Sequence, residues 1–260
     1  MDLELTGRCA VVTGGSRGIG LAVARALAAE GADVALVARG EDALRHAAQE
    51  VADASGRRVI WAAADTGDDA SVRAMAASVI EQLGGVDILV NAAATPATGA
   101  PFTDDDLERE VNVKVRGYLR CARAFAPQMA ERGWGRIINI SGLAARQTGS
   151  IVGTVRNVAV AAMTKNLADE LGSQGINVTV VHPGMTRTER TPEALAAMAQ
   201  ARGTSVEELE RRLESGVAIG RLVTAEEVAA VVTFLASPRS VALNGDAVVA
   251  GGGSRGSIHY

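Results

Sequence analysis

A glycine-rich loop between a predicted strand and a predicted helix most constrains the fold of this chain. The loop reads Thr13-Gly14-Gly15-Ser16-Arg17-Gly18-Ile19-Gly20; it follows an apolar run over residues 9–13 and opens a helical pattern near residues 18–30. Gly14 suits a tight turn, Gly18 a close approach of a pyrophosphate, and Gly20 close packing of helix on strand. The free N–H groups and the positive dipole end of that helix favour phosphates. This context predicts a dinucleotide-binding unit.

The rest of the chain repeats the alternation of strand and helix. Continuous apolar runs, typical of parallel strands covered on both faces, are followed by helical patterns. The predicted strands are 9–13, 33–38, 59–63, 88–92, 136–140, 177–181 and 246–249, and the predicted helices lie near 18–30, 41–54, 69–83, 104–132, 152–173 and 225–236. We therefore expect an α/β fold: a single-domain Rossmann-type doubly wound parallel sheet of about seven strands, with helices on both faces, over residues 1–260.

Residues 185–222 interrupt this alternation with a helical pattern over 194–213. The segment follows the sixth predicted strand, at the carboxyl edge where open α/β sheets bind ligands. We interpret it as a substrate lid within the single domain; the alternative is a surface excursion without a role. It contains arginines that are candidates for attracting an anionic group, although solvated charges are commoner: Arg187, Arg190, Arg211, Arg212 and Arg221.

Composition and charge exclude several classes of function. The formal net charge is -4 and there is no long basic run, which argues against a nucleic-acid partner. No uncharged apolar run is long enough to span a membrane, and the start Met1-Asp2-Leu3-Glu4-Leu5 has no export signal. Cys9 and Cys121 lie far from any Cys/His cluster. We therefore expect reduced thiols, a cytoplasmic location and no metal site.

The charges near the predicted adenosine site favour one cofactor. NAD sites place an Asp or Glu at the end of the second strand, to bind the ribose 2′-OH. Here that strand ends Val37-Ala38-Arg39-Gly40, without an acid, and Arg17 lies in the glycine loop. Guanidinium groups bind phosphate with charge and a fixed fork, which suits a 2′-phosphate. We expect NADP rather than NAD; the alternative is that both arginines are solvated.

With these motifs the chain resembles the short-chain dehydrogenase/reductase family over nearly its whole length. The resemblance rests on the glycine spacing, on Asp65 after the third strand, on Asn91-Ala92-Ala93-Ala94 after the fourth, and on His182-Pro183-Gly184 with Thr188. It implies that Ser141 and Asn112 are catalytic residues. It also implies a set of cofactor-binding residues: Gly14, Ser16, Arg17, Gly18, Ile19, Gly20, Arg39, Asp65, Thr66, Asn91, Ala92, Pro183, Gly184 and Thr188.

The family's catalytic Tyr and Lys, four residues apart on one helix face, are missing. The stretch Ala162-Met163-Thr164-Lys165-Asn166-Leu167-Ala168 resembles the family's sequence after that pair and sets the register. Counting back puts Gly153 at the Tyr position and Asn157 at the Lys position. Gly has no proton to donate, and a neutral Asn does not lower a neighbour's pKa as an ammonium does.

No obvious substitute appears in the sequence. Arg156 is expected to point about 100° away from Asn157 and remains ionised. His182 has a suitable pKa but is better explained structurally. Lys114 lies on another helix and is set aside. Tyr260, in the terminal tail, is a candidate only for a neighbouring subunit's pocket.

Three functions therefore remain open. The first is an NADP-binding oxidoreductase that acts on a carbonyl or hydroxyl group of a small molecule by atypical or weakened chemistry. The second is an inactive cofactor-binding sensor, scaffold or partner subunit, and the third is a non-redox isomerase, dehydratase or lyase. The resemblance also implies a homodimer or homotetramer through the helices at 104–132 and 152–173. Outward candidates there are Ala122, Ala126, Ala162 and Leu167.

Overall fold

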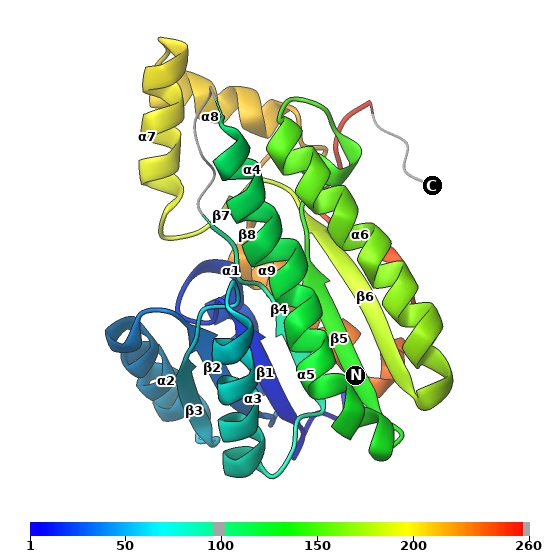
Figure 1. Cartoon of the computed structure of the whole chain (residues 1–260). Coiled ribbons are helices and arrows are strands. Elements are labelled where there is room, and N and C mark those ends of the chain that lie inside the picture. The colour runs from blue at the N-terminus through cyan, green and yellow to red at the C-terminus, as the bar shows by residue number, and fades with distance from the viewer. Residues whose placement is uncertain (96–101, 257–260) are drawn as a thin grey trace.

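The computed structural model describes residues 1–95 and 102–256 of the chain. A parallel sheet of seven strands runs through it in the order β3-β2-β1-β4-β5-β6-β9 (Figure 1). Its strands are β1 (Cys9–Thr13), β2 (Asp33–Ala38), β3 (Val59–Ala63), β4 (Ile88–Asn91), β5 (Gly135–Ile140), β6 (Ile176–Pro183) and β9 (Ala247–Ala250). The predicted single-domain doubly wound fold is confirmed, and the apolar runs are strands because helices bury both faces of the sheet.

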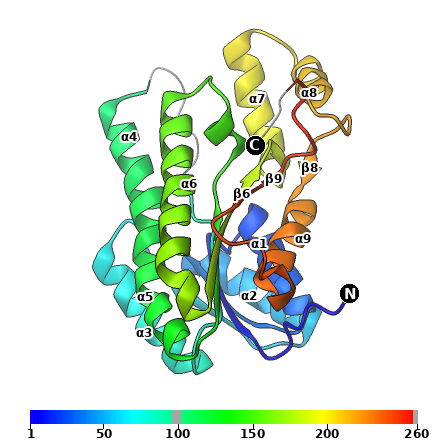
Figure 2. The ribbon, with the colours of Figure 1, turned by 90° about the vertical axis from the view of Figure 1, so that its right-hand side faces the viewer.

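Two layers of helices cover the sheet. On one face lie α1 (Gly18–Ala29), α2 (Glu41–Ser55) and α9 (Ala225–Ala236). On the other lie α3 (Asp69–Leu83), α5 (Gly117–Glu131) and α6 (Ile151–Leu171); Figure 2 shows α3, α5 and α6 on one side of the sheet and α1 and α9 on the other. In α2 the buried Leu44, Ala47, Ala48 and Val51 follow helical spacing, so a single stripe faces the sheet.

The predicted helix at 104–132 contains a π-helical segment. It consists of α4 (Asp104–Glu110), the π-helical η1 (Val111–Arg116) and α5. Thr103 begins α4 with a capping box to Asp106. The wider π turn changes the register of the side chains that follow, which a search for 3.6-residue periodicity does not detect. The expected outward positions also differ: Ala122, Ala126 and Leu167 are buried, whereas Ala162 is exposed.

The predicted insertion forms two helices rather than one. These are α7 (Thr191–Arg202) and α8 (Val206–Ser215), which rise beyond the carboxyl edge of the sheet in Figure 1. Gly203, with φ of 61°, ends α7 in the left-handed conformation, and Ser205 caps α8. At the base of the insertion β7 (Thr186–Arg187) pairs with β8 (Val223–Thr224), so the excursion begins and ends at one place.

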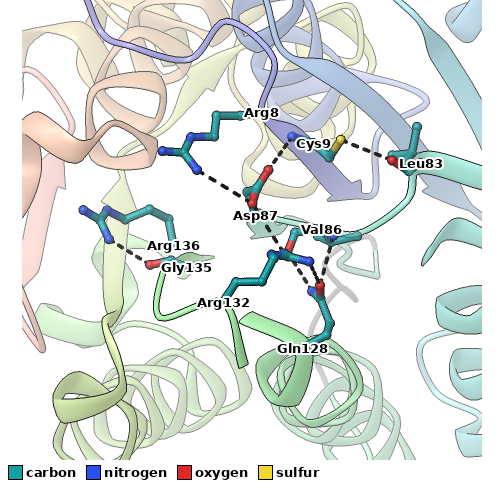
Figure 3. Close-up of polar contacts among 9 residues, drawn as sticks. All are labelled: Arg8, Cys9, Leu83, Val86, Asp87, Gln128, Arg132, Gly135 and Arg136. Atoms are coloured by element: carbon teal, nitrogen blue, oxygen red, sulfur yellow. Dashed lines mark hydrogen bonds and ion pairs between the residues drawn. The ribbon is translucent and has the colours of Figure 1, made fainter. Parts of the chain in front are cut away.

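A polar cluster fixes the opposite, amino-terminal edge of the sheet (Figure 3). The Asp87 carboxylate accepts a hydrogen bond from the Cys9 N–H at 2.9 Å, and the Arg132 guanidinium bonds the Val86 carbonyl at 2.5 Å. Arg136 is almost fully buried there, and burial with the charge of Arg8 lowers its pKa to about 10. These contacts join the starts of β1, β4 and β5, and leave the carboxyl edge open for a ligand.

Candidate active site

A cavity of about 830 Å³ opens at the carboxyl edge of the sheet, where the strand order reverses between β1 and β4. Open α/β sheets bind ligands at this switch point, and the volume is ordinary for a ligand site. Most of the predicted site residues line it: Gly14, Ser16, Arg17, Ile19, Gly20, Arg39, Asp65, Thr66, Ala92, Ser141, Pro183, Gly184 and Thr188.

The glycine loop is held against the end of β4. Gly14 has φ of +68°, and a Cβ there would lie 2.8 Å from the Ala92 carbonyl oxygen. At Gly20 a Cβ would lie 2.3 Å from the Gly14 carbonyl oxygen, so a side chain is excluded. The Thr13 hydroxyl accepts hydrogen bonds from the N–H groups of Ala92 and Ala93 at 3.1 and 3.2 Å. The loop therefore has a fixed shape beside the cavity.

The N-terminus of α1 binds a negatively charged oxygen. Arg17 stands at the cap position without a side-chain capping bond, and the Gly18 N–H donates to Glu189 Oε1 at 3.1 Å. A helix N-terminus attracts anions through its free N–H groups and its dipole. The glycine loop therefore fits a phosphate, whose oxygen would take the place of the Glu189 carboxylate.

Arg17 and Arg39 are exposed and line the cavity, as expected of residues that bind a 2′-phosphate. Neither forms an ion pair with a described residue. The lid arginines behave differently: Arg187 pairs with Glu210 and Glu214, Arg212 with Glu208, and Arg221 with Glu227. Of the five arginines predicted there, Arg190 lines the cavity.

Three of the predicted residues lie outside the cavity lining. Gly18 takes part through its N–H, as described above. Asn91 is fully buried, and its Nδ2 donates to Asn139 Oδ1 at 2.9 Å. Asn112 turns away: its Nδ2 donates to the Gly67 carbonyl and its Oδ1 accepts from Arg120, both at 3.0 Å. The structure does not bring Asn112 to Ser141.

Ser141 lies at the end of β5 and faces α6. Its hydroxyl donates to the Asn157 carbonyl oxygen at 3.0 Å and lies 3.3 Å from Asn157 Oδ1. Gly153 is buried one turn earlier, and its N–H donates to Ser150 Oγ at 3.0 Å. A Cβ on Gly153 would lie 2.9 Å from that same Ser150 oxygen. A side chain at position 153 would therefore require Ser150 to move.

Lys114, which the sequence argument set aside, lines the cavity. It is 4% exposed, and its Nζ donates to the Ser141 carbonyl oxygen at 2.9 Å. Burial lowers its pKa to about 8. One turn later the Tyr118 hydroxyl donates to the Ile140 carbonyl at 3.0 Å, and burial raises its pKa. The chain has only two lysines, and that scarcity is the signal that could have singled out Lys114.

Arg156 also lines the cavity, although the helical geometry predicted that it would point away from Asn157. It forms an ion pair with Glu110, which is 1% exposed and accepts a hydrogen bond from the Thr95 hydroxyl. Burial lowers the pKa of Arg156. The pair brings α4 and α6 together beside the cavity, with its two charges compensating each other.

Two other expectations concern the rest of the chain. His182 is buried and does not line the cavity, whereas Tyr260 lies outside the described residues. Within residues 1–95 and 102–256 there is no cluster of His, Cys, Asp and Glu able to hold a metal ion. No helix in the same two ranges has the length and apolar character needed to cross a membrane.

Comparisons with known proteins agree with this geometry. The family described as short chain dehydrogenase matches residues 8–199. The short-chain reductase protein NovJ of Streptomyces niveus is 35% identical over 247 residues, which cover 94% of this chain and 92% of NovJ. The crystal structure of L-sorbose reductase from Gluconobacter frateurii, complexed with NADPH and L-sorbose, is 32% identical, with a TM-score of 0.92 over 99% of this chain and 100% of that one. Actinorhodin polyketide ketoreductase with NADPH is 33% identical, with a TM-score of 0.89 over 95% and 96%.

Proposed function

Because the chain belongs to the short-chain dehydrogenase family, we propose that it is an NADP-dependent oxidoreductase that interconverts a carbonyl and a hydroxyl group of a small molecule. One observation carries the proposal. A single cavity joins the glycine loop and two arginines, which have no ion-pair partner among the described residues, to Ser141 at the end of β5. The cofactor and the substrate therefore have adjoining places in one site.

The residues present fit the parts of NADP. The glycine loop and the N-terminus of α1 would hold the pyrophosphate, and Arg17 and Arg39 would hold the 2′-phosphate. Asp65 and Thr66 border the adenine end. Ala92, Pro183, Gly184 and Thr188 line the nicotinamide end, with Asn91 fixing the end of β4 beneath it.

The chemistry at the nicotinamide end is atypical. Bound NADPH supplies a hydride to a carbonyl carbon, and a proton must reach the carbonyl oxygen. Ser141 is able to orient that oxygen once its hydroxyl leaves Asn157. Gly153 has no side chain to give the proton. The reaction therefore needs another proton source, which is water, the substrate or a different residue.

The relatives support a carbonyl substrate. The protein from Gluconobacter frateurii is a sorbose reductase, and its structure contains the ketose L-sorbose. A putative ketoacyl reductase of Streptomyces coelicolor is 34% identical over 94% of this chain. We propose a small ketone or aldehyde as substrate, covered by the lid at 185–222, whose Met185, Thr186 and Arg190 line the cavity.

Oligomer and location follow as further parts of the proposal. On α6 the exposed Ile151, Val155 and Val158 recur at helical spacing and form an apolar face. We propose that this face pairs across a two-fold axis in a homodimer or homotetramer. Both cysteines are free, in keeping with a cytoplasmic enzyme.

Substitution of the two arginines tests the cofactor. Because charge-assisted hydrogen bonds contribute about 1.5–3 kcal/mol each, we expect Arg17→Gln and Arg39→Gln each to weaken NADPH binding about tenfold or more and to leave NADH binding nearly unchanged. NADPH fluorescence measures both dissociation constants. The control is Arg25→Gln, an exposed arginine that pairs with Glu50 away from the cavity. Equal losses for NADPH and NADH would contradict the assignment.

A turnover screen separates this function from the two alternatives. NADPH consumption is followed with ketones, aldehydes and acyl thioesters. Oxidation of NADPH with formation of an alcohol supports the oxidoreductase. Tight NADPH binding without turnover favours an inactive cofactor-binding protein. This is the second candidate function, because Gly153 has no side chain that could donate a proton. A substrate change without NADPH consumption favours a non-redox enzyme.

A further inference from the structure

The two lysines of the chain have opposite environments. Lys165 lies on the exposed side of α6 and pairs with Asp169. Lys114 is buried at the cavity wall, and no described residue forms an ion pair with it. An uncompensated buried cation is costly, and few proteins keep one without a function for it. The position of Lys114 therefore needs an explanation beyond packing.

The π-helical segment η1 carries Lys114 to the catalytic end of the cavity. Its Nζ bonds the backbone carbonyl of Ser141, while the hydroxyl of the same serine bonds Asn157. The ammonium from η1 and the position of the family's missing Lys on α6 thus converge on one residue at the end of β5. We propose that Lys114 is the proton donor and acceptor of this site, an inference that rests on the proposed oxidoreductase function.

The geometry leaves the ammonium able to act. An ammonium has three donor protons, and one is used on the Ser141 carbonyl oxygen. Burial also lowers the pKa of Lys114 to about 8, close to the range where an acid is effective at neutral pH. Arg156, which also lines the cavity, keeps its proton because its guanidinium is a far weaker acid.

In the direction of reduction the carbonyl carbon gains a hydride and its oxygen gains a proton. Bound NADPH would supply the hydride for the new C–H bond, and the C=O π electrons would move to oxygen. That oxygen takes a proton from Lys114 Nζ, which gives the alcohol, a neutral amine and oxidised NADP. The amine then takes a proton from water. In the direction of oxidation the neutral amine accepts the hydroxyl proton.

The charged groups around Lys114 are not the cause of its lowered pKa. Of the charged groups on elements packed against η1, Glu110 on α4 and Arg156 on α6 neutralise each other. On α5, burial raises the pKa of Tyr118 and keeps it neutral, and Arg120 bonds the backbone carbonyls of residues 66 and 112. Desolvation is the cause of the lowered pKa of Lys114 itself.

NMR of the lysine side chains tests the pKa of Lys114 and its position near the cofactor without a measurement of turnover. Selective ¹³C-lysine labelling gives two side-chain Cε signals, and Lys165→Arg assigns them. We expect the Lys114 signal to titrate near pH 8 and to shift on addition of NADP⁺, while the Lys165 signal does not respond to NADP⁺. Titration of Lys114 at the ordinary value of about 10.4, without a response to NADP⁺, would overturn the proposal.

Kinetics then test the proton transfer. With the ketone that reacts fastest in the screen, single-turnover reduction should fall as pH rises through about 8, because the ammonium is lost. Lys114→Met and Lys114→Arg should each slow reduction at least about 100-fold and leave NADPH binding within a few-fold. Lys165→Met is the matched control and keeps the rate and the pH profile.

Two failures are distinguishable. If the wild type reduces ketones and Lys114→Met does so with the same rate and pH profile, the role of Lys114 is wrong and the proposed function stands. If the wild type binds NADPH but reduces nothing, the proposed function is wrong. The lysine titration then decides whether Lys114 is the acidic group at the nicotinamide end of the site.

Discussion

Lys114 has an energetic cost as well as a proposed role. Its folded pKa of about 8 lies below the unfolded value of about 10.4, so the unfolded chain binds more protons between these two values. The free energy of unfolding therefore increases with pH across this window. The cost is fully present below about pH 8 and disappears above about pH 10.4.

The first prediction follows from that cost. At neutral pH Lys114→Met should raise the free energy of unfolding by about 3 kcal/mol, since each pKa unit corresponds to about 1.36 kcal/mol. The gain should vanish above about pH 10.4. Urea unfolding followed by circular dichroism at several pH values measures it, with Lys165→Met as the control. A lower free energy of unfolding for Lys114→Met would mean that the hydrogen bond to the Ser141 carbonyl stabilises the fold by more than desolvation of the ammonium destabilises it.

Most of the site residues predicted from the sequence line the cavity, but the sequence did not predict all of the chemistry. Gly14, Arg17 and Arg39 were predictable because their roles depend on a local strand–loop–helix pattern. The assignment of Asn112 came from the family resemblance, whereas the structure turns its side chain to Gly67. The π turn lies between sequence neighbours that look helical, so the inward position of Lys114 was not visible.

Among the helices, α6 carries the positions that the resemblance assigns to a catalytic Tyr and Lys, and the sequence predicts Gly153 and Asn157 there. Ser150 fills the space into which a side chain at 153 would begin. Restoring the pair must therefore also clear Ser150. Ser150→Gly removes the obstructing atoms, and Gly at an N-cap costs only a few tenths of a kcal/mol relative to Ser.

The second prediction concerns this repair. The variant Ser150→Gly, Gly153→Tyr, Asn157→Lys should reduce ketones about 100-fold faster than Ser150→Gly alone, because a tyrosine with a nearby ammonium supplies a general acid. Steady-state NADPH consumption measures the rate. The matched control carries Gly153→Phe in place of Gly153→Tyr, which keeps the ring and lacks the hydroxyl. Equal rates for the Tyr and Phe variants would show that the register on α6 is wrong.

Most elements were predictable, because their patterns are local. The strands agree with the apolar runs to within a residue or two, for example β1 and β2 at Cys9–Thr13 and Asp33–Ala38. Gly203 divides the predicted helical pattern at 194–213 into two helices. The sequence also left open whether the arginines of the insertion bind a ligand or form ion pairs. Ion pairs such as that of Arg187 with Glu210 join residues far apart in sequence, so a local pattern does not reveal them.

At the scale of the whole molecule, the sheet brings distant segments to one edge. The glycine loop after β1, the end of β5 and the start of the lid are far apart in sequence and line one cavity. The family match over residues 8–199 and the NADPH complexes of similar enzymes support the same assignment. The substrate was not predictable, because the insertion at 185–222 forms its own small core around Leu195, Ala199 and Leu209 and carries no recognisable specificity motif.

The dissociation constants of NADPH and NADH for the unmodified chain show whether the cavity selects NADP. Both are measured by cofactor fluorescence under the same conditions and at low salt. Because Arg17 and Arg39 have no ion-pair partner among the described residues and no acid ends β2, NADPH should bind at least about tenfold more tightly than NADH. Equal affinities, or no binding of either cofactor, would contradict an NADP-dependent oxidoreductase.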